Sequence, residues 1–150
     1  MSDQPRLVPY ADRDSAPWWA AVARHELVQQ RCDACATWRW PPRAMCGECA
    51  SFDWSWQPIV DTGTVVSWIR THHAFLPGFH APYETVFVRL HLAEGCDQDD
   101  IVMPGTWFGT IPPKTGMIVQ AHFDDIPVDS GGVDGDDHVS LVGWKPAGDH

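Results

Sequence analysis

The chain has few basic residues and no long apolar run, and each shortage argues against a class of protein. Ten Lys and Arg stand against twenty Asp and Glu, which gives a formal net charge of -10. General nucleic-acid binding needs a basic surface, so this balance argues against it. The sequence contains no run of about eighteen apolar residues, so it predicts no membrane span. The first residues, Met-Ser-Asp-Gln-Pro-Arg, lack the apolar stretch of a signal peptide, so we expect none.

The sequence also lacks the short motifs that mark common active sites. The G-x-S-x-G, G-x-G-x-x-G and P-loop patterns are absent. His72 and His73 are adjacent, and neighbouring side chains of a strand face opposite ways, so the two cannot readily share one metal. We therefore name no catalytic residue. A stand-alone enzyme that uses His72 or His73 as its base is the alternative.

Cysteine is scarce, but four of the five cysteines stand in one pattern. Cys32, Cys35, Cys46 and Cys49 form two Cys-x-x-Cys pairs with ten residues between them. This spacing is typical of a tetrathiolate zinc ribbon, in which two facing knuckles close a tetrahedron around one Zn²⁺. Four protein ligands leave no open position, so the zinc would be structural. Two disulfides or chance spacing are the alternatives, and Cys96 receives no role.

The order of local patterns predicts a mainly β chain with an N-terminal helix, a rubredoxin-like zinc ribbon and a five-stranded OB-fold barrel. Asp14 or Ser15 can cap the helix, and Pro17 falls in its first turn. Beyond the ribbon, β-branched and aromatic residues recur in five short segments between turn residues. Five strands fit an OB-fold, and a five-stranded sandwich is the competing arrangement. The expected strands are residues 64–70, 85–92, 100–110, 117–123 and 139–144.

These elements divide the chain into three segments. We expect the N-terminal segment and helix at residues 1–26, the ribbon at 27–57 and the OB-fold domain at 58–150. A Gly/Asp-rich stretch at 129–137 is expected to be a solvated loop. Cysteines that hold a metal fit a reducing compartment, so we expect a cytoplasmic protein.

One uncharged stretch, Phe75 to Tyr83, is a candidate contact surface. It combines aromatic residues with Pro and Gly in an expected loop, and loops on rigid scaffolds often carry binding. Nine Trp in the chain also hint at a protein–protein interface. A self-packed loop that covers one end of the barrel is the alternative. The candidate ligand or partner contacts are Phe75, Phe79, Pro82, Tyr83, His72, His73 and Arg43.

The order of the motifs resembles a known family. A helix with a Trp-Trp pair precedes the first Cys-x-x-Cys, Pro41-Pro42-Arg43 stands between the two pairs, and Gly63-Thr-Val and Pro82-Tyr83 follow. This arrangement is similar to the zinc-ribbon and OB-fold proteins of acyl-CoA metabolism, which were long filed as a domain of unknown function. The likeness covers residues 15 to 146. The chain departs from the usual pattern at Ala36, where Gly commonly follows the second cysteine, so Ala there is either unstrained or slightly strained.

The resemblance implies a non-catalytic partner of thiolase-like enzymes that helps to hold acyl-CoA as a shared ligand. An aldolase that acts on CoA thioesters, as in steroid side-chain degradation, is the pairing we favour by analogy. A scaffold for another thiolase or hydratase complex is the alternative within the family. A nucleic-acid-binding OB module is the alternative from another class. Because the basic residues form no visible cluster, we expect the partner to supply the contacts to the CoA phosphates, while this chain offers an apolar wall.

Overall fold

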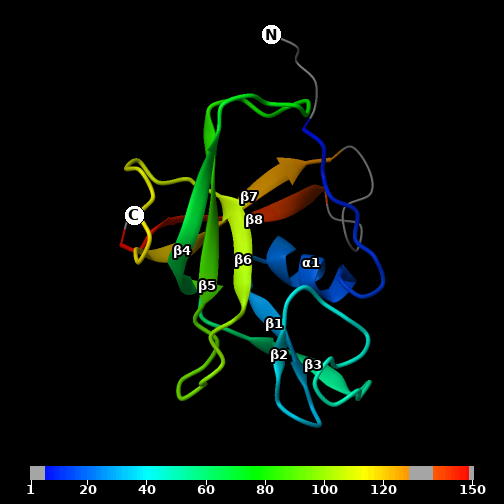
Figure 1. The fold of residues 1–150 in the computed structure, drawn as a ribbon. Coiled ribbons are helices and arrows are strands. Elements are labelled where there is room, and N and C mark those ends of the chain that lie inside the picture. The colour runs from blue at the N-terminus through cyan, green and yellow to red at the C-terminus, as the bar shows by residue number, and fades with distance from the viewer. Residues whose placement is uncertain (1–5, 129–136, 149–150) are drawn as a thin grey trace.

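The structure is a computed structural model in which residues 6–128 and 137–148 are described (Figure 1). The chain begins with a single short helix, α1 (Ala16–Ala23), which buries Trp18, Ala21 and Val22 on one face. Ser15 takes the N-cap position without a side-chain bond to the helix, contrary to the expected cap. The Ser15 hydroxyl instead donates to the Asp12 carboxylate over 2.6 Å, so the capping residue and an upstream aspartate fix the approach to the helix.

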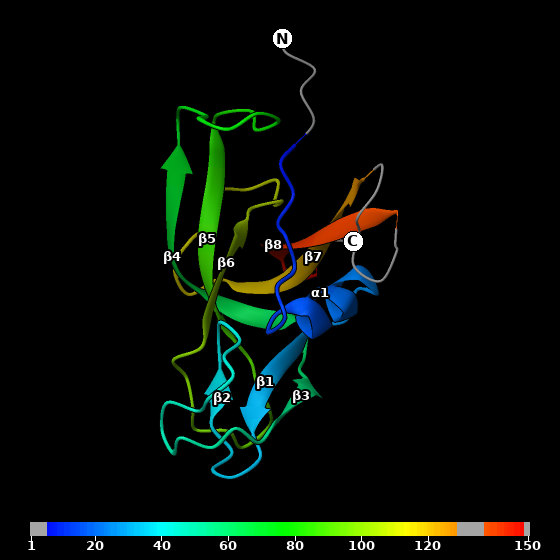
Figure 2. The same ribbon diagram turned by 90° about the vertical axis from the view of Figure 1, so that its right-hand side faces the viewer.

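The zinc ribbon is a small antiparallel sheet at one end of the molecule (Figure 2). Its strands are β1 (Val28–Cys32), β2 (Trp38–Arg39) and β3 (Trp54–Pro58), in the order β2-β1-β3. The turn between β1 and β2 lies at the end of this sheet that points away from the barrel, whereas the loop between β2 and β3 starts beside α1 and descends to that far end (Figures 1 and 2).

The second sheet closes into the predicted OB-fold barrel, and the sandwich alternative is wrong. Its strand order is β6-β5-β4-β7-β8. Trp107 and Trp144 form a parallel bridge after β6, and the N–H of Phe108 donates to the Trp144 carbonyl over 2.8 Å, so β8 returns to β6. This closure is the five-stranded Greek-key barrel of an OB-fold. The strands are β4 (Thr62–Thr71), β5 (Tyr83–Leu90), β6 (Val102–Thr106), β7 (Ile118–Pro127) and β8 (His138–Pro146).

Two glycines permit this closure. A Cβ atom on Gly143 would lie 2.7 Å from the Thr106 carbonyl oxygen, and one on Gly105 would lie 2.8 Å from the Val142 carbonyl oxygen. Side chains at these positions would hold the two strands apart, because real Cβ atoms do not approach backbone oxygens so closely. Glycine on both strands therefore lets β6 and β8 meet.

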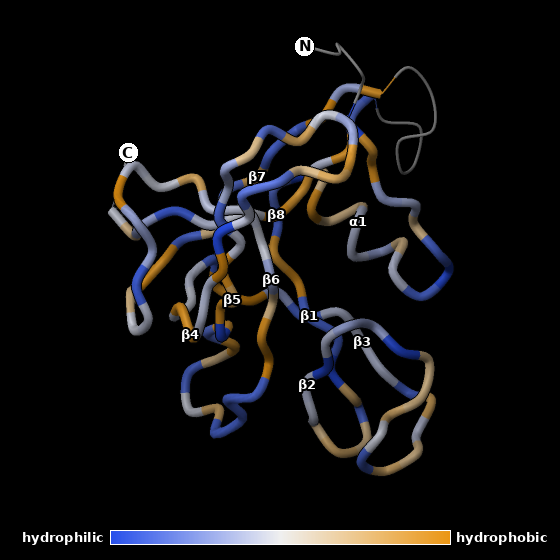
Figure 3. Tube along the Cα trace, turned by 45° about the horizontal axis from the view of Figure 1, so that its top comes forward, coloured by the Kyte–Doolittle hydropathy of each residue, from blue (hydrophilic) through white to orange (hydrophobic). Residues whose placement is uncertain are grey.

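One apolar cluster joins the helix, the ribbon and the barrel. It contains Trp18 and Val22 of α1, Trp38 of the ribbon, and barrel residues such as Val86 and Trp144. Figure 3 shows the hydrophobic segments running through the barrel strands β5, β6 and β8. Because a shared core resists separation, the ribbon is attached to the barrel by packing as well as by the chain.

Some expectations fall outside what the structure describes. The Gly/Asp-rich stretch lies outside the described residues except for Asp137. The boundaries of the three predicted segments, and the expected cytoplasmic location, stay predictions. Within the described ranges, no helix has the length and apolar character that crossing a membrane requires.

Candidate functional site

The two cysteine pairs sit in turns of the same construction. In the first knuckle the N–H of Ala36 donates to the Cys32 carbonyl over 2.9 Å, and the N–H of Cys32 donates to the Thr37 carbonyl over 2.9 Å. The second knuckle repeats the first bond between Ala50 and Cys46 over 3.0 Å. Ala36 and Ala50 both have positive φ, 64° and 58°, so alanine occupies a left-handed position in each turn.

The four sulfur atoms form a compact cluster that fits a tetrahedral metal. All four Sγ atoms lie within 4.8 Å of one another, and the Cys32–Cys49 and Cys35–Cys46 pairs are each 3.6 Å apart. A tetrahedron with Zn–S bonds of about 2.3 Å has S···S edges of about 3.8 Å. These distances exceed the length of a disulfide bond, about 2.05 Å, so the cysteines are unbridged. The donor set therefore suits one structural Zn²⁺.

The thiols of this cluster have unequal acidities. The hydroxyl and backbone amide of Thr37 lower the pKa of Cys35 to about 6. The backbone amide of Ser51 lowers the pKa of Cys49, but the Cys35 thiol, desolvation and the other two thiols outweigh it and raise that pKa to about 12. Four adjacent thiolates repel one another, so they do not all ionise unaided. A bound cation supplies the positive charge that lets all four ionise.

Two arginines near the knuckles stabilise backbone groups. The Nε of Arg31 donates to the Ala36 carbonyl over 3.1 Å, and its guanidinium lies 5.3 Å from the centre of the Trp38 ring. Arg43 follows β2 and donates from Nη1 to the Pro42 carbonyl over 3.2 Å. Arg31 thus braces the first knuckle, while Arg43 lies in the loop between the strands.

The predicted contact loop lies at the far end of the molecule from the ribbon (Figures 1 and 2). His72 and His73 come just after β4 ends, and the rings of His73 and Phe75 are 4.9 Å apart. The Phe79 and Tyr83 rings are 5.8 Å apart. The structure brings most of the candidate residues together in this loop, but it places Arg43 in the ribbon, away from them.

The loop is covered on one side by the N-terminal segment. The guanidinium of Arg6 lies 4.9 Å from the centre of the Phe79 ring and pairs with Asp124 at 2.6 Å. Gly78 has a φ of 76°, and a Cβ atom there would lie 2.5 Å from the Arg6 Cα. The Phe79 side of the loop is therefore packed against the N-terminal segment, whereas Phe75 remains 85% exposed.

The strand before this loop carries an apolar surface that the sequence does not reveal. β4 pairs with β5 along Gly63 to Thr71, but it pairs with β7 only at Thr62 to Thr64. The outer half of β4 therefore has one open edge and carries Trp68 and Ile69, which are 40% and 54% exposed. Strand alternation alone could not reveal this, because it does not tell how far a neighbouring strand extends.

We call residues 66–85, the outer parts of β4 and β5 with their loop, the arm. Exposed apolar residues on a protruding strand pair and its loop indicate an interaction surface.

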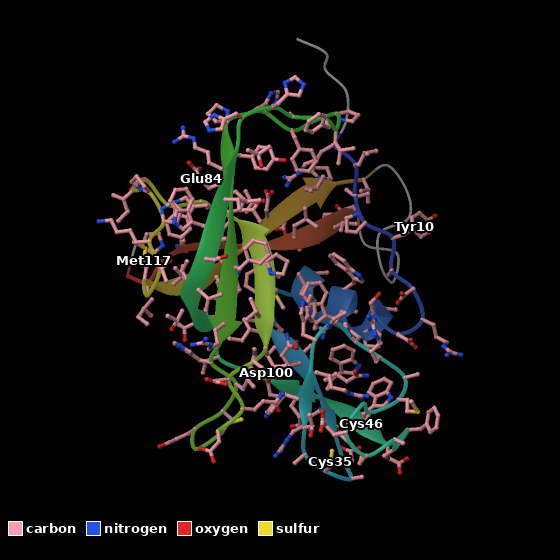
Figure 4. All side chains as sticks on the ribbon, in the orientation of Figure 1. Tyr10, Cys35, Cys46, Glu84, Asp100 and Met117 are labelled. Carbon is pink, nitrogen blue, oxygen red and sulfur yellow. The ribbon has the colours of Figure 1, made fainter. Side chains whose placement is uncertain are left out.

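In the part of the chain that the structure describes, His72 and His73 have no hydrogen bond or ion pair that would tune either as a base. Figure 4 shows Glu84 on the arm, and Cys35 and Cys46 at the opposite end. The metal cluster and the arm are thus separate features. The arm's exposed apolar residues include Trp68, Ile69, Phe75 and Leu76.

Nearly the whole chain is similar to a protein of known structure. The structure titled Ltp2-ChsH2(DUF35) aldolase aligns with a TM-score of 0.74 and 33% sequence identity, covering 93% of this chain and 99% of that chain. A DUF35-family protein of unknown function from Sulfolobus solfataricus aligns with a TM-score of 0.51 at 14% identity, over 75% of this chain and 78% of that one. The second likeness concerns the fold alone.

Sequence comparisons agree with this placement. Residues 19–55 match the family model described as ChsH2, rubredoxin-like zinc ribbon domain. The probable enoyl-CoA hydratase alpha subunit of Thermomonospora curvata is 44% identical over 82 residues, 55% of this chain. The 3-oxo-4,17-pregnadiene-20-carboxyl-CoA hydratase alpha subunit of Mycobacterium tuberculosis is 29% identical over 140 residues, 92% of this chain. This chain spans only 26% and 39% of these two relatives.

Proposed function

This chain belongs to the DUF35 family with a ChsH2-type zinc ribbon, and from that membership we propose that it is the accessory subunit of a thiolase-like aldolase acting on CoA thioesters. The observation that carries the proposal is the alignment, over nearly the whole chain, with the solved structure named Ltp2-ChsH2(DUF35) aldolase. In this proposal the partner holds the catalytic groups and this chain completes the assembly.

The names of the relatives indicate a class of substrate. A hydratase adds water to an enoyl-CoA and yields a β-hydroxyacyl-CoA. An aldolase can cleave the Cα–Cβ bond of that product, which yields a carbonyl compound and a shorter acyl-CoA. A steroid CoA thioester appears in the name of one relative. We therefore propose a β-hydroxyacyl-CoA, with a steroid as the candidate acyl group, as the substrate of the complex.

The chain's own chemistry supports an accessory role. A Zn²⁺ held by Cys32, Cys35, Cys46 and Cys49 has no position left for water or substrate, so it stabilises the ribbon without acting on a substrate. His72 and His73 are exposed, and the His73 ring lies beside the aromatic ring of Phe75. The net charge of -10 argues against the alternative of a nucleic-acid-binding OB module.

We assign the contact with the partner, or with the shared acyl-CoA, to the arm. Its exposed aromatic and aliphatic side chains supply apolar contact area, and the open edge of β4 offers unpaired backbone groups. The partner supplies the phosphate contacts of CoA in this assignment.

The test is co-purification and turnover with a thiolase-like protein encoded beside this chain. We expect a stable complex that cleaves a β-hydroxyacyl-CoA, whereas the purified chain alone does not. Tyr83→Ala should weaken association with the partner about tenfold, because Tyr residues that become buried at an interface are frequent hot spots. The variant should still bind one zinc per chain. The matched control is Tyr10→Ala, since Tyr10 is 96% exposed outside the arm. Turnover by the isolated chain, or equal association of both variants, would contradict the proposal.

A hydratase complex is the second candidate, because both curated relatives are named hydratase alpha subunits. The same purified assembly distinguishes the two reactions. Hydration consumes an enoyl-CoA and keeps the carbon chain, whereas cleavage shortens the acyl group, so mass spectrometry of the acyl-CoA products separates them.

A further inference from the structure

Three side chains of the ribbon form a row that nothing in the proposed function uses. Gln30 of β1 is directly opposite Arg39 of β2 on one side and Trp56 of β3 on the other. Directly paired residues of antiparallel strands project from the same face of a sheet. The register therefore places the three side chains next to one another across the whole width of the ribbon.

The row consists of buried hydrogen-bond donors without acceptors. Gln30 is fully buried, and its Oε1 accepts the N–H of Arg43 over 2.9 Å, which leaves its Nε2 as a donor. Arg39 is 8% exposed, and its Nε, Nη1 and Nη2 have no partner among the described residues. The Nε1 of Trp56 is also buried and unpaired. All the unused groups of the row are donors, so they require acceptor atoms.

A charge without a counter-ion distinguishes this row from the other unpaired polar groups of the described residues, because Arg6, whose Nε is also buried and unpaired, forms an ion pair with Asp124. The Gln29 amide, next along β1 and thus on the opposite face, is also buried and unpaired, but it is neutral. Arg39 carries a full positive charge, and within the described ranges it has no ion pair. Water can satisfy hydrogen bonds but cannot neutralise a buried charge, whose desolvation is costly unless an anion pairs with it.

A groove gives access to Arg39 from solvent. Its volume is about 520 Å³, and Arg39, Trp40 and Arg43 line it together with the acidic residues Glu48 and Asp100. The Asp100 carboxylate already accepts the Gln98 Nε2 over 2.9 Å, and neither acid forms an ion pair with Arg39. Figure 4 shows Asp100 where the segment before β6 passes the ribbon. The acids at the groove therefore leave the guanidinium without a counter-ion.

We propose that Arg39, Gln30 and Trp56 form a binding site for a phosphate-type oxyanion, which enters from this groove. A tetrahedral oxyanion offers acceptor atoms in several directions, and a guanidinium can bind two of its oxygens at once. The amide of Gln30, next to Arg39 in the row, and the indole N–H of Trp56, on the other side of Gln30, supply further donors. Because the contacts are buried, salt screens the binding weakly.

Equilibrium dialysis of the zinc-loaded full chain against radiolabelled inorganic phosphate tests the site. We expect one phosphate per chain, little weakened by sodium chloride. Arg39→Met should weaken binding at least tenfold, because it removes the charge and the forked donors. Arg89→Met makes the same change at an exposed barrel residue and should bind like the wild type. No binding by the wild type, or equal binding by Arg39→Met, would overturn the proposal.

A second pair of variants keeps the test decisive if Arg39→Met does not fold. Trp56→Phe keeps an aromatic ring beside Trp54, whose centroid is 5.9 Å away, and removes only the N–H donor. We expect about tenfold weaker phosphate binding with unchanged zinc content. Trp54→Phe is the matched control, since its side chain does not belong to the row. Equal affinities of both variants and the wild type would place the anion elsewhere and refute the site.

Competition identifies the source of the oxyanion. If CoA displaces labelled phosphate and pantetheine does not, the site receives a phosphate group of a nucleotide ligand. If phosphate binds and CoA does not compete, the site receives the free ion. Both results support an oxyanion site, whereas failure of the chain to bind phosphate removes the site and leaves the proposed accessory function, which rests on partner assembly, untouched.

Discussion

At the scale of single residues, Ala36 and Ala50 hold backbone positions that suit glycine better. Their φ values of 64° and 58° lie in the left-handed region, which costs a non-glycine residue about 1–2 kcal/mol. Glycine loses about 0.5–1 kcal/mol more backbone entropy on folding than alanine does. The strain is the larger effect, so the knuckles are slightly strained as the sequence stands.

Ala36→Gly should therefore stabilise the zinc-loaded chain by about 0.5–1 kcal/mol, which raises Tm by roughly 2 °C for a chain of this size. Thermal unfolding followed by circular dichroism measures this. The matched control is Ala34→Gly in the same knuckle, where φ is not positive and the entropic loss should lower Tm instead. A lower Tm for both variants would show that Ala36 is unstrained.

Another local feature is a carboxylate that joins the end of the helix to the barrel. Both oxygens of Asp125 lie 3.0 Å from the Nε2 of His25, and the Ser140 hydroxyl donates to the same carboxylate. The Nε2 of His138 lies 3.3 Å from the Ala23 carbonyl and 3.9 Å from Asp125. Asp125 thus links the residues after α1 to β7 and β8.

Two groups of this cluster have shifted pKa values. Burial acts to raise the pKa of Asp125, but hydrogen bonds from Ser140 and His25 outweigh it and lower that pKa below 3.8. The Asp137 carboxylate raises the pKa of His138 above 6.5. The Asp125 contribution to stability is present above pH 3.8 and lost as pH falls through its folded pKa. The His138 contribution is present below pH 6.5 and lost as pH rises through its folded pKa.

We therefore expect the cluster to stabilise the fold most between pH 3.8 and 6.5. Asp125→Asn should lower Tm by about 2 °C at pH 5, since the pair is half exposed and solvent weakens it. The difference from the wild type should shrink toward pH 3. Melting curves across this range check the sign, with Asp99→Asn in an exposed loop as the control. A difference that grows as the solution becomes more acidic would contradict the assignment.

At the scale of elements, the approach of β6 to β8 depends on Gly143 and Gly105. Gly143→Ala would bring its Cβ to 2.7 Å from the Thr106 carbonyl oxygen and against the Phe108 ring. A backbone oxygen cannot move aside as the end of a flexible side chain can, so we expect the free energy of unfolding to fall by about 2–3 kcal/mol. Chemical denaturation measures it. Gly95→Ala is the control that separates crowding from backbone strain, because a Cβ atom there meets no atom within 4 Å while the φ of Gly95 is 74°. We expect this substitution to lower the free energy of unfolding by about 1 kcal/mol. Because the φ of Gly143 is not positive, a loss no larger than that of Gly95→Ala would show that the contact with Thr106 is relieved at little cost.

The sequence predicted the elements well where the signal was local. Paired Cys-x-x-Cys motifs predicted the ribbon, and alternation predicted the strands near Val86 and Val119, because both signals depend on neighbouring residues. The loop of the arm was proposed from the sequence, but the exposed surface of its strand was not, since the exposure of Trp68 depends on where β7 leaves β4. The burial of Arg39 was not predicted either, because it depends on the fold of the ribbon and not on neighbouring residues. Features set by contacts between distant segments thus escaped sequence reasoning.

At the scale of the whole molecule, the metal centre and the barrel are joined by one core. Leu27 and Trp38 of the ribbon share a cluster with Trp18 of the helix and with Val86 and Trp144 of the barrel. Loss of the ribbon would expose the apolar surface of the barrel that these side chains cover. Zinc binding should therefore stabilise the barrel as well as the ribbon, because folding of the two is linked.

Cys35→Ser removes one ligand of the cluster and should release zinc, because four thiolates are needed to complete the site. We expect a single cooperative unfolding transition whose midpoint falls by more than about 10 °C, since each lost kcal/mol lowers Tm by roughly 2–4 °C. Calorimetry with elemental analysis measures both effects. Cys96→Ser, outside the cluster, should keep zinc and Tm. A barrel transition that persists at the wild-type midpoint beside a separate low one would show that the ribbon and barrel unfold independently.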